Sequence, residues 1–252
     1  MRDLRSFAPT LCRMLGVTPP ALASGSGLDE IAGEARRALV YCPDAVGLHA
    51  LERWPELHAR LRRVATHEIE LRAMVPPKTP VCYASLFTGG APQEHGITRY
   101  ERPVLSCDTV FDALVRARRR TAIVAVKDSS IDLIFRGRAI DYHSMTYDPL
   151  VTARVLELLA ACAHDVIVAY HQEYDDLVHA TGPFSPLAAR AAERHVESWE
   201  LLVDGASASW GSGYVAAFCP DHGAHDVPGT GLGDHGDDRP EDMRVRHFFA
   251  VR

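Results

Sequence analysis

Apolar runs of strand length alternate with segments of helical period along most of the chain. Four runs are almost continuously apolar, as is typical of strands buried on both faces: ALVYC (38–42), AIVAV (122–126), DVIVAY (165–170) and YVAAF (214–218). Apolar residues recur at helical spacing over 48–64, 109–117, 150–161 and 186–204. This alternation predicts an α/β domain with a mostly parallel central sheet and helices on both faces.

Two parts of the chain depart from this alternation. Residues 1–34 contain a short amphipathic piece around Phe7–Leu15, followed by the loop-like stretch TPPALASGSG. We expect them to form a peripheral N-terminal segment, with the main domain over 35–252. The stretch 135–147 lacks a strong apolar run and predicts a small excursion on the substrate side, which with 181–194 would wall a substrate site.

Composition narrows the possible partners. The chain has 252 residues and a formal net charge of −6, which argues against a basic groove for a nucleic-acid polymer. Six cysteines are scattered without a CxxC pair, so neither a zinc ribbon nor a disulfide framework is indicated. No signal-peptide pattern or membrane-length apolar run is present. We therefore expect a soluble, cytoplasmic protein without a membrane partner, and the oligomeric state stays open.

Polar residues with metal-ligand chemistry follow the predicted strands. They are Asp44 after 38–42, Asp175 and His179 after 165–170, Asp221 and His222 after 214–218, and His235 in a glycine-rich loop beyond. Carboxyl ends of parallel strands meet at one edge of a sheet, where a crevice opens. Oxygen and imidazole ligands gathered there are what a hydrolytic two-metal site requires.

Each of these residues also has a simpler explanation when taken alone. Asp44 fits a helix N-cap or a turn residue. Asp175 and His179 fit an exposed pair of side chains at positions i and i+4 of a helix. Four such segments in strand-end positions favour the metal site over these separate explanations.

Thr79 is the candidate nucleophile. The segment PPKTPVCYASLFTGG predicts an extended approach followed by a helix with Pro80 near its first position. The Thr79 hydroxyl would then lie at a helix N-terminus, where backbone N–H groups and the helix dipole favour a phosphoryl oxygen. A role for Thr79 as a simple N-cap remains the alternative.

These segments resemble the alkaline phosphatase superfamily, particularly its nucleotide pyrophosphatase/phosphodiesterase-like branch. Three blocks carry the resemblance: Lys78-Thr79-Pro80 with Thr88-Gly89 and Pro92-x-x-His95-Gly96-Ile97; Tyr174-Asp175-(x)3-His179-(x)2-Gly182-Pro183; and Asp221-His222-Gly223 with His235-Gly236. The similarity runs from about Ala38 to the C-terminus. It implies an alkaline phosphatase-like three-layer sandwich over 35–252 with a minimal cap.

The resemblance also implies a reaction and a ligand set. One divalent ion would be held by Asp175, His179 and His235, and the other by Asp44, Asp221 and His222 together with the Thr79 oxygen. Thr79 would attack phosphorus in line, giving a phosphothreonine intermediate that is then hydrolysed. Nitrogen and oxygen ligands suit Zn²⁺ or Mn²⁺. The expected substrate is a small phosphate ester, either a phosphodiester or pyrophosphate or a monoester.

Two residues bear on the substrate class. Cys82 occupies a position that is often asparagine in nucleotide phosphodiesterases, and Lys127 ends the run 122–126; both are candidate substrate contacts. The departure at Cys82 leaves two alternatives open: a phosphonate or phosphoryl-transfer enzyme of the same superfamily, and a metal-binding relative without turnover. His95 and His171 are expected to be structural, hydrogen-bonded histidines.

Overall fold

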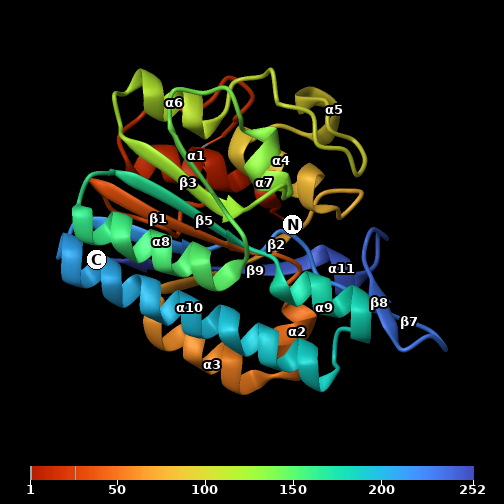
Figure 1. The fold of residues 1–252 in the computed structure, drawn as a ribbon. Helices are drawn as coiled ribbons and strands as arrows, with labels where there is room; N and C mark the ends of the chain where they lie inside the picture. The colour runs from red at the N-terminus through yellow and green to blue at the C-terminus, as the bar shows by residue number, and fades with distance from the viewer. Residues whose placement is uncertain (1, 26) are drawn as a thin grey trace.

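The central sheet of the computed structural model has seven strands in the order β2-β9-β6-β1-β5-β3-β4, and residues 2–25 and 27–252 are described (Figure 1). The strands are β1 (Arg37–Pro43), β2 (His67–Arg72), β3 (Thr121–Val126), β4 (Asp141–Met145), β5 (Val166–His171), β6 (Tyr214–Phe218) and β9 (Arg244–Val251). A separate hairpin pairs β7 (His225–Val227) with β8 (Leu232–Asp234). β9 pairs antiparallel with β2 and with β6, and the other four pairs of the central sheet are parallel, so the sheet is mostly parallel.

Helices cover both faces of this sheet (Figure 1). One layer holds α2 (Leu48–Arg53), α3 (Pro55–Val64), α8 (Asp148–Ala161), α9 (Glu173–Thr181) and α10 (Pro186–Trp210). The other holds η1 (Leu4–Ser6), α1 (Phe7–Met14), α4 (Thr79–Thr88), α5 (Pro92–His95), α6 (Val110–Arg116) and α7 (Ser130–Ile134). The short α11 (Pro240–Met243) precedes β9. The predicted three-layer α/β architecture is confirmed.

The predicted elements recur with small shifts, and one helix is divided. The expected helix over 48–64 is two helices, because Pro55 begins α3 and Trp54 before it has φ −122° and ψ 75°, outside the helical region. Steric clash with a following proline ring disfavours the helical conformation of the preceding residue. Proline at the first turn of the new helix costs no hydrogen bond.

Three strands of the central sheet, β2, β4 and β9, and both strands of the hairpin were not predicted. The sequences of β2 and β4 are too polar to form an apolar run. β2 (HEIELR) pairs antiparallel with β9. Arg244 and Arg246 of β9 also form ion pairs with Glu70 of β2, at 2.8 and 3.0 Å. The stretch 135–147, expected to extend over the substrate, instead contributes the edge strand β4, and Phe135 is fully buried. Edge strands carry polar side chains that hide them from an apolar-run criterion.

Helix α4, which begins at Thr79, lies in an aromatic core. All ten of its residues are buried, and Phe87 contacts Phe111 and Phe135 at ring-centroid distances of 5.0 and 5.3 Å. Phe7 of the N-terminal segment packs edge-on against Phe87 at 5.9 Å. A helix that is apolar on all sides is stable only when surrounded. The start of α4 is therefore held in place from several directions.

Strand register brings the carboxyl ends of the parallel strands to one edge. β1 pairs with β5 so that Pro43 lies opposite His171, and with β6 so that Tyr41 lies opposite Phe218. The segments that follow β1, β5 and β6 consequently emerge side by side. No helix in the part of the chain that the structure describes is long and apolar enough to cross a membrane.

Candidate metal centre

Three buried side chains meet where β1 and β6 end. Asp44 directly follows β1. Asp221 and His222 follow β6 after Cys219 and Pro220. His222 Nε2 lies 3.5 Å from Asp44 Oδ1 and 3.3 Å from Asp221 Oδ2. Thr79, the first residue of α4, places its Oγ1 3.5 Å from Asp44 Oδ1 and 3.3 Å from His222 Nε2. We call Asp44, Asp221 and His222 the strand cluster.

A second group forms beside it on a helix and a loop. Asp175 and His179 lie one turn apart on α9, and His235 follows β8. Asp175 Oδ1 is 3.6 Å from His179 Nε2 and 3.4 Å from His235 Nε2. The His179 side chain is 43% exposed, whereas the other two are buried or nearly so. We call these three residues the helix cluster.

The two clusters are in contact through their histidine rings. The His222 and His235 rings stack with centroids 4.0 Å apart and an interplanar angle of 20°, and the His179 ring lies 5.0 Å from that of His235. All seven residues predicted from the sequence as metal ligands or nucleophile thus occupy one continuous site.

The three histidines share one orientation. Each Nδ1 lies within hydrogen-bond distance of a backbone carbonyl: His222 to Gly223 at 3.0 Å, His235 to Pro77 at 2.8 Å and His179 to Gly233 at 3.2 Å. A carbonyl only accepts, so Nδ1 must carry the proton and Nε2 keeps its lone pair. Each Nε2 then faces carboxylate oxygens with an acceptor rather than a donor.

Two carboxylate oxygens in the site have no hydrogen-bond donor. Asp175 Oδ1 and Asp221 Oδ2 are buried and unpaired among the described residues. Buried polar atoms are nearly always satisfied, so acceptors that converge on one another point to a missing cation. Histidine that donates Nδ1–H to a carbonyl while offering Nε2 is the usual arrangement around a bound metal. The donor set fits divalent ions at both clusters.

Electrostatics support the same conclusion. Burial raises the pKa of Asp44 and Asp221 well above the ordinary range of a carboxyl, and the charge of a neighbouring Asp adds to each shift. Burial, with the Asp221 charge, raises the pKa of Asp175 to about 8. Burial lowers the pKa of His235 to about 3 and that of His222 well below its usual range. A divalent cation would reverse the cost of holding these carboxylates ionised.

A cavity of about 160 Å³ opens beside Thr79 and Asp44. Tyr100, Arg102, Lys127, Asp128, Ser129, Ser130, Tyr170, Gln172, Asp175 and Asp176 complete its lining. Lys127 therefore lies where a substrate contact was predicted. Cys82 does not line this cavity, since its fully buried Sγ lies 4.0 Å from the Met74 carbonyl oxygen. The walls come from Tyr100 and Arg102, from 127–130 and from the segment that joins β5 to α9. Neither 135–147 nor 181–194, the two predicted walls, contributes a lining residue.

Sequence reasoning missed Tyr170, and it did not predict the contact that Lys78 makes in the site. Tyr170 donates its hydroxyl to Asp44 Oδ2, and Lys78 donates its ammonium to the His235 carbonyl. Tyr170 lies at the carboxyl end of β5, shortly before the predicted ligands Asp175 and His179. The alternation of side chains along a strand could have indicated on which face of the sheet it lies. Gly223 is required sterically: a Cβ there would lie 2.0 Å from the Glu241 carbonyl oxygen.

Comparisons with known proteins agree with this geometry. The sequence model of the type I phosphodiesterase / nucleotide pyrophosphatase family matches residues 39–112, which include Asp44 and Thr79. The resemblance to the alkaline phosphatase superfamily is confirmed. No curated protein is a significant match over the sequence.

Solved structures extend the likeness to the fold. Murine ectonucleotide pyrophosphatase / phosphodiesterase 5, as an inactive threonine-to-alanine variant with AMP, is similar with TM-score 0.61 and 16% identity, covering 77% of this chain and 59% of that one. Phosphonoacetate hydrolase from Sinorhizobium meliloti 1021, with phosphonoformate, gives TM-score 0.56 and 20% identity, covering 75% and 57%. The chain thus spans under two thirds of these similar structures.

Proposed function

We propose that this chain is a hydrolase of small phosphate esters that binds two divalent ions, Zn²⁺ or Mn²⁺, and uses Thr79 as its nucleophile. The observation that carries the proposal is the common orientation of His179, His222 and His235. Each turns an unprotonated Nε2 toward carboxylate oxygens. Two of those oxygens have no donor among the described residues.

The comparisons support this class of reaction. The matching family is that of type I phosphodiesterases and nucleotide pyrophosphatases, and its match includes Thr79. One similar structure is described as inactive when a threonine is replaced by alanine, and it binds AMP. We infer that residues 35–252 form the catalytic domain and that a nucleotide-like diester or a monoester is the substrate.

The chain's own residues supply position and charge. Thr79 begins α4, so the helix dipole favours negative charge at its hydroxyl. Asp44, Asp221, His222 and the Thr79 oxygen would hold one ion, and Asp175, His179 and His235 the other. When bound, a pair of divalent ions would lower the pKa of the threonine hydroxyl and offset charge on the phosphoryl oxygens. Tyr170 orients Asp44 by hydrogen bonding to its other oxygen.

Hydrolysis of a phosphonate is the second candidate function. Arg102 and Lys127 both line the cavity beside Thr79. Two cationic side chains in the same cavity favour a substrate with a second anionic group, such as a carboxylate on the leaving portion. A similar solved structure is a phosphonoacetate hydrolase.

Replacement of the nucleophile tests the proposal. With Zn²⁺ or Mn²⁺ added, Thr79→Ala is expected to lower kcat on aryl phosphate monoesters, aryl phosphodiesters or phosphonoacetate by about 10³-fold or more. Thr88→Ala is a matched control on the same helix, because the Thr88 hydroxyl bonds only the local backbone. Chelation should abolish activity and readdition of the ion should restore it.

Three results would contradict parts of the proposal. Unchanged turnover in Thr79→Ala would remove Thr79 from the mechanism. Two bound ions without turnover of any compound in the panel would favour a metal-binding relative. Phosphorus NMR of the products separates hydrolysis from phosphoryl transfer, since transfer leaves the phosphoryl group on an acceptor other than water.

A further inference from the structure

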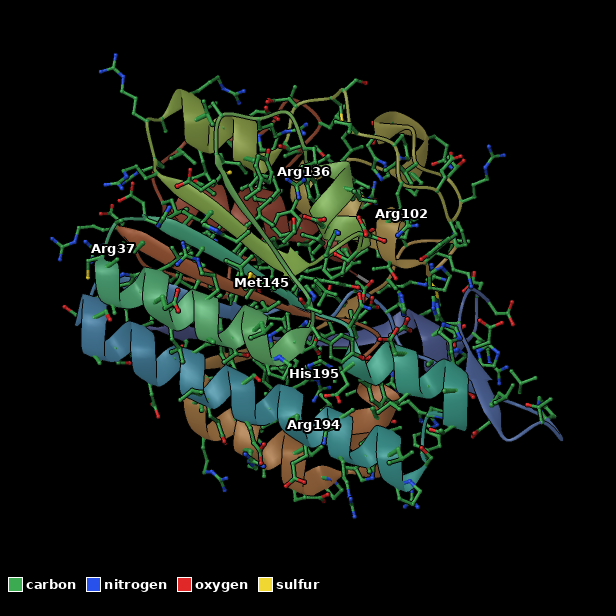
Figure 2. All side chains as sticks on the ribbon, in the orientation of Figure 1. Arg37, Arg102, Arg136, Met145, Arg194 and His195 are labelled. Carbon is green, nitrogen blue, oxygen red and sulfur yellow. The ribbon has the colours of Figure 1, made fainter. Side chains whose placement is uncertain are left out.

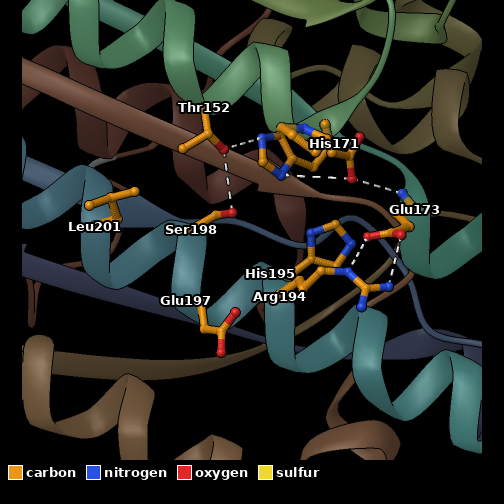
Figure 3. Close-up of a pocket in the computed structure, with 10 residues that line it drawn as sticks. Thr152, His171, Glu173, Arg194, His195, Glu197, Ser198 and Leu201 are labelled. Atoms are coloured by element: carbon orange, nitrogen blue, oxygen red, sulfur yellow. Dashed lines mark hydrogen bonds and ion pairs between the residues drawn. The ribbon is translucent and has the colours of Figure 1, made fainter.

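A third buried group of metal-ligand side chains lies below the sheet, away from Thr79. Asp148 begins α8, His171 ends β5 and His195 lies on α10, and their ligand atoms all fall within 4.8 Å of one another. They line a cavity of about 270 Å³ (Figure 3). Figure 2 shows His195 on α10 and Arg102 in the loop after α5, on opposite sides of the sheet.

The hydrogen bonds of this group run in one direction. The Tyr174 backbone N–H donates to His195 Nε2 at 3.2 Å, so the His195 proton lies on Nδ1. That Nδ1–H donates to the Tyr41 hydroxyl at 2.9 Å, and the hydroxyl donates to His171 Nδ1 at 2.9 Å. His171 Nε2–H then donates to Thr152 Oγ1 at 3.2 Å. Every imidazole nitrogen is occupied, so this is a hydrogen-bonded network and not a metal site.

The network ends on the N-terminus of α9. Asp148 Oδ1 accepts from the Gln172 N–H and Asp148 Oδ2 from the Glu173 N–H, each at 3.0 Å. His195 accepts the next N–H along, that of Tyr174. The first N–H groups of a helix have no partner within it. Here three consecutive groups are bound by side chains from α8 and α10.

This attachment matters because of what α9 carries. Asp175 follows Tyr174 directly, and His179 lies one turn further. The third member of the helix cluster, His235, comes from the loop after β8, and its Nδ1 is bonded to the Pro77 carbonyl rather than to α9. The strand cluster depends on β1 and β6, which are held by the sheet. A shift at the start of α9 would therefore change the geometry of the helix cluster and spare the strand cluster.

We propose that Asp148 and His195 are positioning residues that hold α9 in register for divalent-ion binding by Asp175, His179 and His235. This inference rests on the proposed function. Residues that orient metal ligands without touching the metal typically change metal affinity by about 10- to 100-fold. Asp148 and His195 would act through the backbone of the helix that presents the ligands, since they bind the N–H groups of residues 172–174.

Calorimetric titration of Mn²⁺ or Zn²⁺ into metal-free protein tests the proposal. The wild type is expected to bind two ions. Asp148→Asn leaves one N–H without an acceptor, and His195→Leu removes the acceptor for Tyr174. Each should weaken one of the two sites by at least about 10-fold and leave the other within threefold. His195→Gln, which offers an amide oxygen near the place of Nε2, should bind both ions nearly as the wild type does.

A surface control and a second readout keep folding effects separate. Arg194, next to His195 on α10, forms a partly exposed ion pair with Glu173 in the first turn of α9. Arg194→Ala removes this ion pair and should leave both affinities within twofold. Hydrogen–deuterium exchange in metal-free protein should be about 10-fold faster over 172–175 in Asp148→Asn and His195→Leu, with β1 and β6 unchanged. That measurement reports the anchoring even where a variant is less stable overall.

The outcomes separate this inference from the proposed function. Two sites of wild-type affinity in both Asp148→Asn and His195→Leu would overturn the positioning role and leave the two-metal proposal standing. Equal weakening of both sites, or unchanged exchange over 172–175, would also overturn it. A wild type that binds no divalent ion would overturn the proposed function and this inference together.

Discussion

Two buried groups in this protein are built from the same two residue types: Asp44, Asp221 and His222 at the strand ends, and Asp148, His171 and His195 between β5, α8 and α10. The strand cluster and the network of Asp148, His171 and His195 each place their ligand atoms within 4.8 Å of one another. In the strand cluster, Asp221 Oδ2 has no donor and His222 Nε2 faces two carboxylates. In the network, backbone and side-chain donors occupy both imidazoles and both Asp148 oxygens.

The difference shows that proximity of ligand-type side chains does not identify a metal site. What distinguishes the two groups is the direction of hydrogen bonds around them. His222 gives its proton to a carbonyl outside the cluster, which leaves an acceptor pointing inward. His195 Nε2 instead accepts a hydrogen bond from the Tyr174 backbone N–H, and its Nδ1–H donates to the Tyr41 hydroxyl. A cation would complete the first group, whereas the second is complete without one.

The largest difference between the two groups is expected from a substitution at Asp221. Asp221→Asn removes a proposed metal ligand and is expected to lower kcat/KM by about 10³-fold, the equivalent of several kcal/mol of lost charge stabilisation. The same variant should make metal-free protein more stable by about 1 kcal/mol, since a buried carboxyl beside Asp44 is neutralised. Steady-state kinetics and thermal unfolding measure the two effects. Asp204→Asn, at an exposed position, should change neither quantity. A loss of stability in metal-free Asp221→Asn would contradict the absence of a hydrogen-bond donor to Asp221 Oδ2.

Replacement within the network should have the opposite effect on stability. His171→Phe leaves the Tyr41 hydroxyl without its acceptor and Thr152 without its donor, both in buried surroundings. The expected loss in free energy of unfolding is about 3 kcal/mol, measured by urea denaturation. His67→Phe on the surface should cost no more than about 0.5 kcal/mol. A change at His171 that small would mean that the network stabilises little.

A pH titration extends the comparison to His95, a histidine that contacts helix α4 through Ser85. Its Nδ1 accepts from the Ile97 N–H at 3.2 Å and its Nε2 lies 2.8 Å from Ser85 Oγ, so both nitrogens are paired. Burial lowers the pKa of His95 to about 4, below the 6.5 of an unfolded chain. The unfolded state then binds the proton first, so stability is fully present above pH 6.5 and is lost as the pH falls toward 4.

His95→Asn removes this titration. Between pH 7 and pH 5 the wild type should therefore lose about 2 kcal/mol more stability than the variant. Urea unfolding of the two proteins at both pH values measures the difference. Equal losses would show that His95 is already protonated in the folded protein, and its pairing would then need a different assignment.

Much of the site was predictable because its ligands follow strands. Asp44, Asp221 and His222 come directly after apolar runs, and parallel strands must end at the same edge. Thr79 was predictable from the prolines before an apolar helix. The network was not: His171 was expected only to be structural, and its partners Tyr41 and His195 carry no local pattern that relates residues more than a hundred positions apart. The wall formed by Tyr100 and Arg102 lies in a loop whose conformation no periodicity specifies.

The sequence alone determined the layered α/β architecture, the strand ends that supply the ligands and the helix that begins at Thr79, because apolar periodicity and proline act over neighbouring residues. Only the tertiary structure decided which of two similar aspartate–histidine groups lacks hydrogen-bond donors, since that depends on carbonyl and N–H groups from distant segments of the chain. It also decided the anchoring of α9 by Asp148 and His195, which requires three helices and a strand to meet.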